Sequence, residues 1–253
     1  MATTLHARSG RVNRSRRWPR AVLLVIGVIG LLLLILVAAL LLIVLLAPSV
    51  SNAPQKVAAI LAAHDAPSDG GVVPTKVATA LLATEDSRYY HDPALDPRGV
   101  TRAVIGVVTR NGNDGGATIE QQLAKMLYAP GTGITSELKQ VGVAFRLDQH
   151  FSKHTILAMY LDAAYFGDGA YGVTAASEHY FAVAPDQLSW AQATLLAGLV
   201  QAPTAYDPHG HLSAARARQS HVLARLVATH TLTEAEANQI FQSPLDPAIS
   251  FYS

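Results

Sequence analysis

The sequence contains no cysteine, which excludes disulfide bonds and metal sites built from thiolates. Its first 20 residues contain no acid, although they include six arginines. Residues 21–47 contain no charged or polar side chain at all. No internal repeat and no low-complexity tract occurs outside that apolar segment. Charge and hydrophobicity are therefore distributed unevenly along the chain.

The charge distribution argues against nucleic acid as a partner. The 253 residues include 19 Lys and Arg against 18 Asp and Glu, a net charge of +1. Without the six arginines of the N-terminal tail, 13 basic residues face 18 acidic ones, so residues 21–253 carry a net charge near −5. A body with this excess of acid repels phosphate backbones. We expect no nucleic-acid partner.

The apolar segment predicts a single transmembrane helix. Its 27 residues would extend for about 40 Å as a helix, enough to cross a bilayer with some tilt. A cleavable signal has a much shorter apolar core, of roughly 7–15 residues, so the length favours an uncleaved anchor. The preceding arginines place the N-terminus in the cytoplasm and the remainder outside. The expected organisation is a cytoplasmic tail at 1–20, an anchor at 21–47, a linker with a membrane-proximal helix at 48–73, and a folded domain at 74–253.

The folded domain is predicted to be mainly α-helical. From Pro74 onward, apolar residues recur at intervals of three and four, and no run shows sustained two-residue alternation. The first helix ends near Glu85 and presents an apolar face made of Val77, Ala78, Leu81 and Leu82. A carboxylate held at this place among alanines and leucines suits a general base. The alternative is that Glu85 and Asp86 merely pair with Arg88 on a wet surface.

A second block begins about thirty residues later, with the sequence Gly115-Gly116-Ala117-Thr118-Ile119-Glu120-Gln121-Gln122-Leu123-Ala124-Lys125. Its hydroxyl, two amides and ammonium fall on one helical face, at Thr118, Gln121, Gln122 and Lys125. The glycine pair allows a tight turn and leaves free backbone amides at the helix start, which suits phosphate oxygens. Alone, such a block is common.

Together with a third block at 156–167, these segments resemble the peptidoglycan glycosyltransferase (transglycosylase) domain of glycosyltransferase family 51. That domain occurs in bifunctional penicillin-binding proteins and in monofunctional cell-wall polymerases, and the resemblance covers about residues 70–210. It implies a lysozyme-like helical domain behind the anchor, outside the plasma membrane of a bacterium. It also implies polymerisation of lipid II into glycan strands with release of undecaprenyl pyrophosphate.

The resemblance assigns roles to particular residues. Glu85 would be the catalytic base, and Lys125 would approach the pyrophosphate. The residues expected to bind substrate are Asp86, Arg88, Thr118, Gln121, Gln122, Lys125, Lys139, Gln140 and Arg146. No tightly bound cofactor is implied, although a divalent cation, Mg²⁺ or Mn²⁺, is compatible with the chemistry. The implied partners are lipid II, the nascent glycan chain, the membrane, and proteins of cell-wall synthesis or division.

Several positions depart from the family pattern: Ala117, Ser136, Glu137, Gln140, Ala158, Asp162 and Gln192. The largest departure is in the helix expected over 136–147, where the family has Arg-Lys and then a glutamate one turn later. The second acid of the family is therefore expected to be absent, while a one-residue shift would bring Lys139 and Arg146 into play. The lost acids leave open a catalytically silent paralogue that binds cell-wall precursor or a division partner.

Three other interpretations carry less weight. A lytic glycosidase of the lysozyme type also uses one glutamate in a helical lobe, but the second block argues against it. Ser136 and Lys139 fit the Ser-x-x-Lys signature of a penicillin-binding serine site, yet neither Lys-Thr-Gly nor Ser-Asp-Asn occurs. His150 and His154 have helical metal-pair spacing, but no acid lies between them and Ser152 is expected to cap a helix.

Two helices near the C-terminus are interpreted as structural. The first is expected over 212–230, and the second is predicted from a capping box formed by Thr233 and Glu236. His91 is the alternative to Glu85 as a base, but it lies beyond the end of the first helix.

Overall fold

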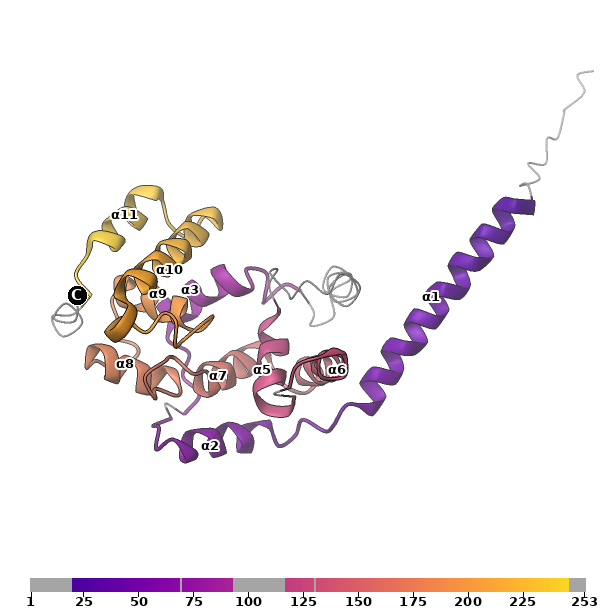
Figure 1. Cartoon of the computed structure of the whole chain (residues 1–253), viewed down its shortest axis with the longest axis horizontal. Coiled ribbons are helices and arrows are strands. Elements are labelled where there is room, and N and C mark those ends of the chain that lie inside the picture. Colours follow the sequence, from indigo (N-terminus) through magenta and orange to yellow (C-terminus); the bar gives the residue numbers. More distant parts are fainter. Residues whose placement is uncertain (1–19, 69, 93–116, 130, 246–253) are drawn as a thin grey trace, which may run out of the picture. The chain divides into compact units, whose positions relative to one another are not determined.

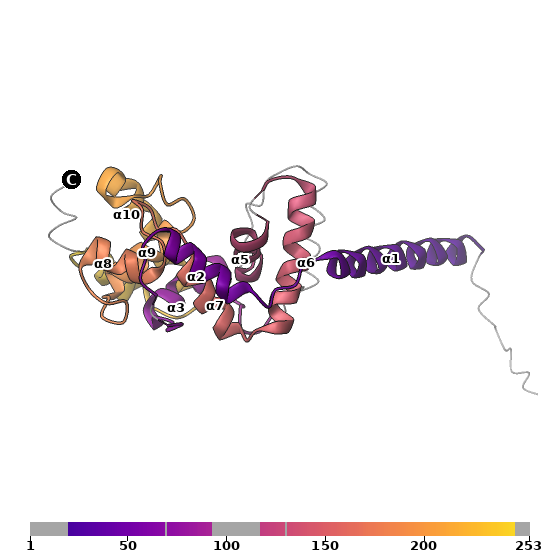
Figure 2. The ribbon, with the colours of Figure 1, turned by 90° about the horizontal axis from the view of Figure 1, so that it is seen from below.

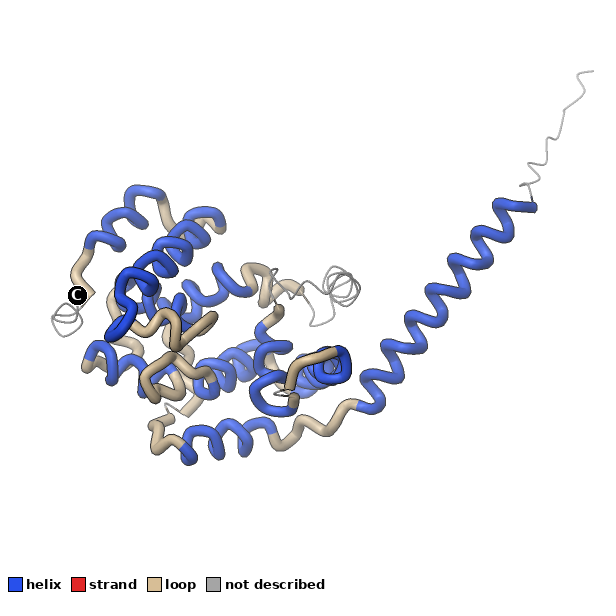
Figure 3. Tube along the Cα trace, in the orientation of Figure 1, coloured by secondary structure: helices blue, strands red, loops and turns tan. Residues whose placement is uncertain are grey.

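The computed structural model describes residues 20–68, 70–92, 117–129 and 131–245. These residues form ten helices, and the only β-type pairing among them is an isolated bridge between Tyr165 and Tyr171 (Figures 1 and 3). The prediction of a mainly α-helical chain behind one apolar helix is confirmed. The described part of the chain divides into two compact units, with the division between Leu42 and Ile43. The predicted domain boundaries stay predictions. The helices are α1 Arg20–Leu46, α2 Ala53–Ala63, α3 Thr75–Glu85, α5 Ile119–Tyr128, α6 Ile134–His150, α7 Lys153–Ala163, α8 Val173–Phe181, α9 Trp190–Leu199, α10 Pro208–Ala228 and α11 Glu234–Gln242.

Helix α1 has the length and composition of a membrane-crossing helix. Its segment from Ala21 to Leu46 has a mean hydropathy of 3.5 and contains no charged residue. Large apolar side chains along it are exposed, with Leu24 at 70%. A long apolar surface of this kind requires a lipid environment or a partner.

The second unit is built around α9, a helix of small and branched apolar residues. All of its residues after Gln192 are buried, as is Ala191. Helices α3 and α10 pack against α9, and α11 packs against α10 (Figure 1). This group holds the C-terminal end of α3, where Glu85 lies, against the middle of α10.

A second group of helices lies on the other side of α3. Helix α5 packs against both α6 and α7, and α2 packs against α7 (Figures 1 and 2). The two groups meet where α3 ends and α5 begins, since the backbone N–H of Ile119 donates to Asp86 Oδ2 over 3.4 Å. The candidate site lies at this junction.

Within the second unit, α6 packs closely against residues 43–47. Arg146 Nε donates to the carbonyl of Val44 over 3.0 Å, and Arg146 Nη2 donates to that of Leu45 over 3.3 Å. These carbonyls belong to the last turn of a helix, where backbone donors are few, and the carbonyl of Val44 accepts in addition from the backbone N–H of Ala47 over 3.3 Å. A Cβ on Gly142 would lie 2.8 Å from the carbonyl oxygen of Ile43. The glycine therefore permits a backbone approach that no other residue allows.

We expect Gly142→Ala to lower the midpoint of thermal unfolding, because the added methyl group forces residues 43–47 away from α6. Overpacking of this kind costs about 1–3 kcal/mol. Gly210→Ala is the matched control, since a Cβ there meets nothing within 4 Å and alanine favours a helix. Unfolding of both variants in detergent, followed by circular dichroism, tests the packing. Equal midpoints for the two variants would contradict it.

Candidate active site

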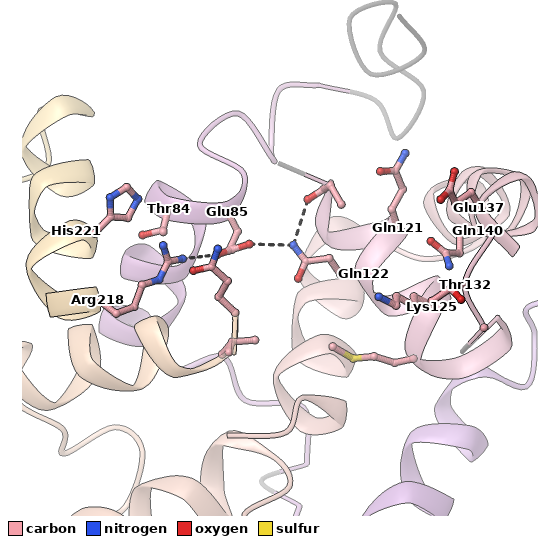
Figure 4. Close-up of a pocket in the computed structure, with 15 residues that line it drawn as sticks. Thr84, Glu85, Gln121, Gln122, Lys125, Thr132, Glu137, Gln140, Arg218 and His221 are labelled. Atoms are coloured by element: carbon pink, nitrogen blue, oxygen red, sulfur yellow. Dashed lines mark hydrogen bonds and ion pairs between the residues drawn. The ribbon is translucent and has the colours of Figure 1, made fainter. Parts of the chain in front are cut away.

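A pocket of about 810 Å³ opens between the end of α3, one face of α5, the start of α6 and the middle of α10. Figure 4 shows its polar side chains, with Glu85 in the centre, Arg218 and His221 on the side of α10, and Lys125 toward α6. The polar residues that line it are Thr84, Glu85, Gln121, Gln122, Lys125, Thr132, Glu137, Gln140, Gln201, Arg218 and His221.

Glu85 is held from both sides. Its Oε1 accepts a hydrogen bond from Arg218 Nη2 over 3.0 Å, and its Oε2 accepts one from Gln122 Nε2 over 3.1 Å. The side chains of Glu85 and Arg218 are only 15% and 11% exposed. A carboxylate has about four lone-pair sites, so both oxygens can still accept a hydrogen bond from a bound hydroxyl. The arrangement fixes the carboxylate without using up its acceptor capacity.

The amide of Gln122 is oriented by a buried tyrosine. Tyr160 Oη donates to Gln122 Oε1 over 2.7 Å, while Gln122 Nε2 also donates to the carbonyl of Ala117 over 3.2 Å. Burial raises the pKa of the Tyr160 phenol, so it keeps its proton and acts as a donor. The oxygen of the Gln122 amide therefore faces Tyr160, and its NH₂ group faces Glu85. This chain of hydrogen bonds fixes the position of the Glu85 carboxylate.

The start of α5 is fixed by its own side chains. Thr118 Oγ1 accepts from the backbone N–H of Gln121, and Gln121 Oε1 accepts from the backbone N–H of Thr118, which forms a capping box. Gln121 also lines the pocket, whereas Thr118 does not. The glycine pair Gly115-Gly116 lies outside the described residues. One turn past Gln121, Lys125 is exposed and lines the pocket.

The wall formed by α6 contains an acid, Glu137, that the sequence analysis named as a departure from the family pattern but did not expect to line the site. Glu137 lines the pocket there with Gln140. Ser136 Oγ and Gln140 Nε2 both donate to the carbonyl of Ala129, each over 3.2 Å. Two of the departing positions thus hold the end of α5 against α6, and Glu137 presents a carboxylate to the pocket.

Five of the residues expected to bind substrate lie outside the lining of this pocket. Arg88 pairs with Asp92 over 2.9 Å, and Arg146 binds the carbonyls of residues 44 and 45. Lys139 is exposed on α6, Thr118 caps α5, and Asp86 lies behind Glu85 at the start of α5. Their roles toward a substrate stay predictions. The residues that the structure does bring together are Glu85, Gln121, Gln122, Lys125 and Gln140.

Sequence reasoning missed the contribution of α10, which it interpreted as purely structural. Arg218 and His221 both line the pocket from this helix. Burial lowers the pKa of His221, and the positive charges of Arg218 and Arg225 lower it further, so the imidazole is neutral at neutral pH. His221 is therefore a further proton acceptor that lines the pocket, besides the carboxylates of Glu85 and Glu137. His91, the alternative considered from the sequence, is exposed and does not line it.

The departure at Gln192 has a structural explanation. Gln192 is the third residue of α9, where its Oε1 accepts from the backbone N–H of Ser189 over 2.8 Å. Glutamine serves this capping box as well as glutamate does. Asp162 accepts from Ser68 Oγ over 3.3 Å, and Ala158 is buried within α7. None of these three residues lines the pocket, so their departures do not bear directly on its chemistry.

Asp86 is expected to lower the stability of the protein at neutral pH. Burial, followed by the nearby Glu120 carboxylate, raises the pKa of Asp86 from 3.8 to about 6. Because the folded state then holds this proton more tightly than the unfolded state, the contribution of Asp86 to the free energy of unfolding falls as pH rises from about 4 to about 6. Asp86→Asn cannot ionise and can still accept from Ile119.

We therefore expect Asp86→Asn to unfold at a higher temperature than the wild type at pH 7.5, with a difference that shrinks as pH falls from 6 toward 4. Thermal unfolding across pH 4 to 8 measures it. Asp65→Asn, at an exposed turn, is the control. A difference that stays constant over this range would refute the assignment.

Comparisons with known proteins identify the family of the chain. A family model described as transglycosylase matches residues 39–227. Penicillin-binding protein 1A of Escherichia coli (strain K12) is 35% identical over 169 residues, which is 66% of this chain and 20% of that protein. Penicillin-binding protein 1A of Aquifex aeolicus is 36% identical over 176 residues, 68% of this chain and 24% of that protein. The chain thus spans about a fifth to a quarter of the length of these relatives.

A crystal structure of penicillin-binding protein 1A from Haemophilus influenzae is also similar. It aligns over 70% of this chain and 17% of that chain, with a TM-score of 0.43 and 21% sequence identity.

Proposed function

Because the chain belongs to the transglycosylase family, whose model matches residues 39–227, we propose that it is a membrane-anchored peptidoglycan glycosyltransferase. Its substrate would be lipid II, which it would polymerise into glycan strands with release of undecaprenyl pyrophosphate. The observation that carries this proposal is Glu85, fixed by Arg218 and Gln122 at the edge of a pocket that also contains Lys125.

The proposed reaction uses Glu85 as a general base. The 4-hydroxyl of one sugar transfers its proton to Glu85 as its oxygen attacks the anomeric carbon of the growing chain. The bond from that carbon to the pyrophosphate breaks on the opposite face, which inverts the configuration. Pyrophosphate leaves as a stabilised anion and needs less help from an acid than an alkoxide does in glycoside hydrolysis. It needs positive charge instead, and Lys125 supplies it from the pocket wall.

Arg218 has a second role in the proposed reaction. Its Nε is buried, so a ligand in the pocket does not reach that nitrogen. The Arg218 side chain nevertheless lines the pocket, and its guanidinium has N–H groups beyond the one that donates to Glu85, so a bound sugar hydroxyl would accept from one of these. Arg218 would then orient two groups, the Glu85 carboxylate and the acceptor sugar.

A divalent cation, Mg²⁺ or Mn²⁺, fits the donor set on the wall of α6. Mg²⁺ prefers oxygen ligands and is often held by one or two carboxylates together with substrate phosphates. Glu137 is the carboxylate available on that wall. The ion would neutralise charge on the leaving pyrophosphate. It would be held with the substrate rather than as a tightly bound cofactor.

Membrane attachment through α1 suits lipid-linked donor and acceptor, because tethering raises the effective concentration of the enzyme at the leaflet where they lie. We propose that the arginines of residues 1–20 hold the N-terminus in the cytoplasm of a bacterium and that the pocket faces outward. Partners would include the nascent glycan chain and proteins of cell-wall synthesis or division.

The test is glycan formation from fluorescently labelled lipid II by the purified full chain in detergent, with Mg²⁺ or Mn²⁺. Polymer should appear on gels and should disappear with moenomycin, the phosphoglycolipid inhibitor of the family. If well-folded protein made no polymer with either metal, the proposed glycosyltransferase activity would be refuted. Binding of labelled lipid II without formation of polymer would instead support the catalytically silent paralogue. One observation favours that alternative: Ser136 and Gln140 both form hydrogen bonds to the backbone of Ala129.

A further inference from the structure

Three potential metal ligands converge on the second unit without lining the pocket. Asp168 lies in the turn after α7, His179 in the last turn of α8, and His209 in the first turn of α10. Asp168 Oδ2 is 2.8 Å from His179 Nε2 and 3.1 Å from His209 Nδ1. The three ligand atoms all lie within 4.8 Å of one another. None of the three residues lines the pocket around Glu85.

The backbone holds each of these side chains in place. Asp168 has a φ of +46°, a left-handed conformation that aspartate tolerates better than most residues. On its N-terminal side, a Cβ on Gly167 would lie 2.9 Å from both the carbonyl of Pro203 and the hydroxyl of Tyr180, so this turn is packed tightly against its neighbours. The backbone N–H of His209 donates to Asp207 Oδ1 over 3.0 Å, which caps α10.

Ring contacts complete the arrangement. The rings of His179 and His209 meet edge to face with centroids 5.3 Å apart, and the ring of Tyr180 lies 5.2 Å from that of His209. The side chains of Asp168, His179 and His209 remain 47%, 37% and 25% exposed, so an ion can reach them from solvent.

We propose that Asp168, His179 and His209 bind a divalent transition-metal ion of the Zn²⁺ type. Two imidazoles and one carboxylate form a donor set that Zn²⁺ accepts, with nitrogen and oxygen ligands near 2.0–2.2 Å. Tetrahedral coordination places ligand atoms about 3.3 Å apart. The Asp–His distances of 2.8 and 3.1 Å must therefore open by a few tenths of an ångström, and the two histidine nitrogens, which lie within 4.8 Å of each other, must reach the same separation. The rings of His179 and His209 are partly exposed and would make this change by turning about their side-chain bonds.

The charge state of the cluster suits a cation. The hydrogen bond from His209, and the one from His179, hold the pKa of the Asp168 carboxyl below its usual range, so it is a carboxylate at neutral pH. Both histidine nitrogens already point at the same carboxylate oxygen. On binding, each would turn a lone pair to the ion, and any proton on that nitrogen would move to the other ring nitrogen or to solvent.

The ion would join three segments at a place where α10 is irregular. His211, two residues after the proposed ligand His209, has φ −139° and ψ 47°, which are not helical angles. Beyond this kink the helix continues to Arg218 and His221 in the pocket. A bound ion would anchor the first turn of α10 to α8 and to the turn at Asp168. The site is therefore expected to be structural, with solvent or another ligand in its remaining coordination positions.

A zinc-binding measurement on the full chain tests this proposal. The protein is purified in detergent without a histidine tag, and a chelator removes bound metal beforehand. Isothermal titration with ZnCl₂ should give one ion per chain for the wild type. His179→Ala, His209→Ala and Asp168→Asn should each weaken this binding at least tenfold. Asn also tolerates the left-handed backbone at position 168. His154→Ala, an exposed histidine in α7, is the control and should bind as the wild type does.

Thermal unfolding gives a second measurement that separates lost binding from lost folding. Each variant should unfold cooperatively in the presence of chelator, and zinc should raise the midpoint of the wild type and of His154→Ala only. The chain has ten histidines in total, so zinc could bind elsewhere. Stoichiometric binding that persists in all three ligand variants would overturn the proposal, and so would a wild type that binds no zinc. In the latter case the three residues form only a hydrogen-bonded cluster.

Discussion

Replacing Glu85 with Gln should lower the rate of glycan formation by about 10²–10⁴-fold, the usual effect of losing a general base. The substitution preserves size and removes basicity. It also disturbs the network, because the NH₂ of Gln122 faces position 85 and Tyr160 holds the Gln122 amide in that orientation. The new amide at position 85 would have to present its oxygen to both donors. The rate should be measured with labelled lipid II, together with the unfolding midpoint.

Two further variants make this result specific. Glu178→Gln, in an exposed position on α8, removes the same charge and should leave the rate unchanged. His221→Gln tests the neutral imidazole at the pocket as an alternative base, and it should lower the rate far less than Glu85→Gln. If His221→Gln lost most of the activity and Glu85→Gln kept it, the base would lie on α10, and Glu85 would serve only to hold Arg218.

The site could be predicted from the sequence where its residues lie in local motifs. Glu85 ends a helix with a clear apolar face, and Gln121, Gln122 and Lys125 share a face of the next described helix. Their spacing along the chain determines which way they point relative to their own helices. The Gln122–Glu85 contact could therefore be anticipated as soon as the ends of α3 and α5 were expected to meet.

Contacts between distant helices could not be predicted in this way. Arg218 lies 133 residues after Glu85, in a helix with several arginines on its polar face. An amphipathic pattern shows that this face avoids the core, but it does not tell a solvent-facing arginine from one that faces a polar pocket. The same limit hid the role of Tyr160, which lies among apolar residues in α7. It also hid the convergence of Asp168, His179 and His209.

A buried ion-pair network behind the pocket was also hidden from the sequence. Lys153 Nζ lies 2.6 Å from Glu120 Oε1 and 3.0 Å from Asp148 Oδ1, and it donates to the carbonyl of Asp92 over 3.0 Å. The Glu120 side chain is only 1% exposed. The ammonium also lies 4.9 Å from the centre of the Tyr89 ring. Hydrogen bonds and charge interactions with Glu120 and Asp148 raise the pKa of Lys153 although burial opposes this, so it stays charged.

Lys153→Met should lower the free energy of unfolding by about 3–5 kcal/mol, the usual cost of breaking a buried ion pair by removing one partner. Methionine fills much of the lysine volume, so the loss comes mainly from the Glu120 carboxylate, which keeps its burial and loses its cation. Denaturant unfolding in detergent measures the change. Lys139→Met, at an exposed position of α6, is the matched control and should change stability by less than about 0.5 kcal/mol.

A double variant distinguishes the lost charge pair from lost packing. Glu120→Gln in the Lys153→Met background removes the buried charge that has no partner, so it should recover part of the lost stability. In the wild-type background the same Glu120→Gln leaves Lys153 with Asp148, and it should be destabilising. If Glu120→Gln lowered the free energy of unfolding by the same amount in the Lys153→Met background as in the wild type, the two side chains would not be coupled. Lys153 would then stabilise the protein through the Asp92 carbonyl and the Tyr89 ring instead.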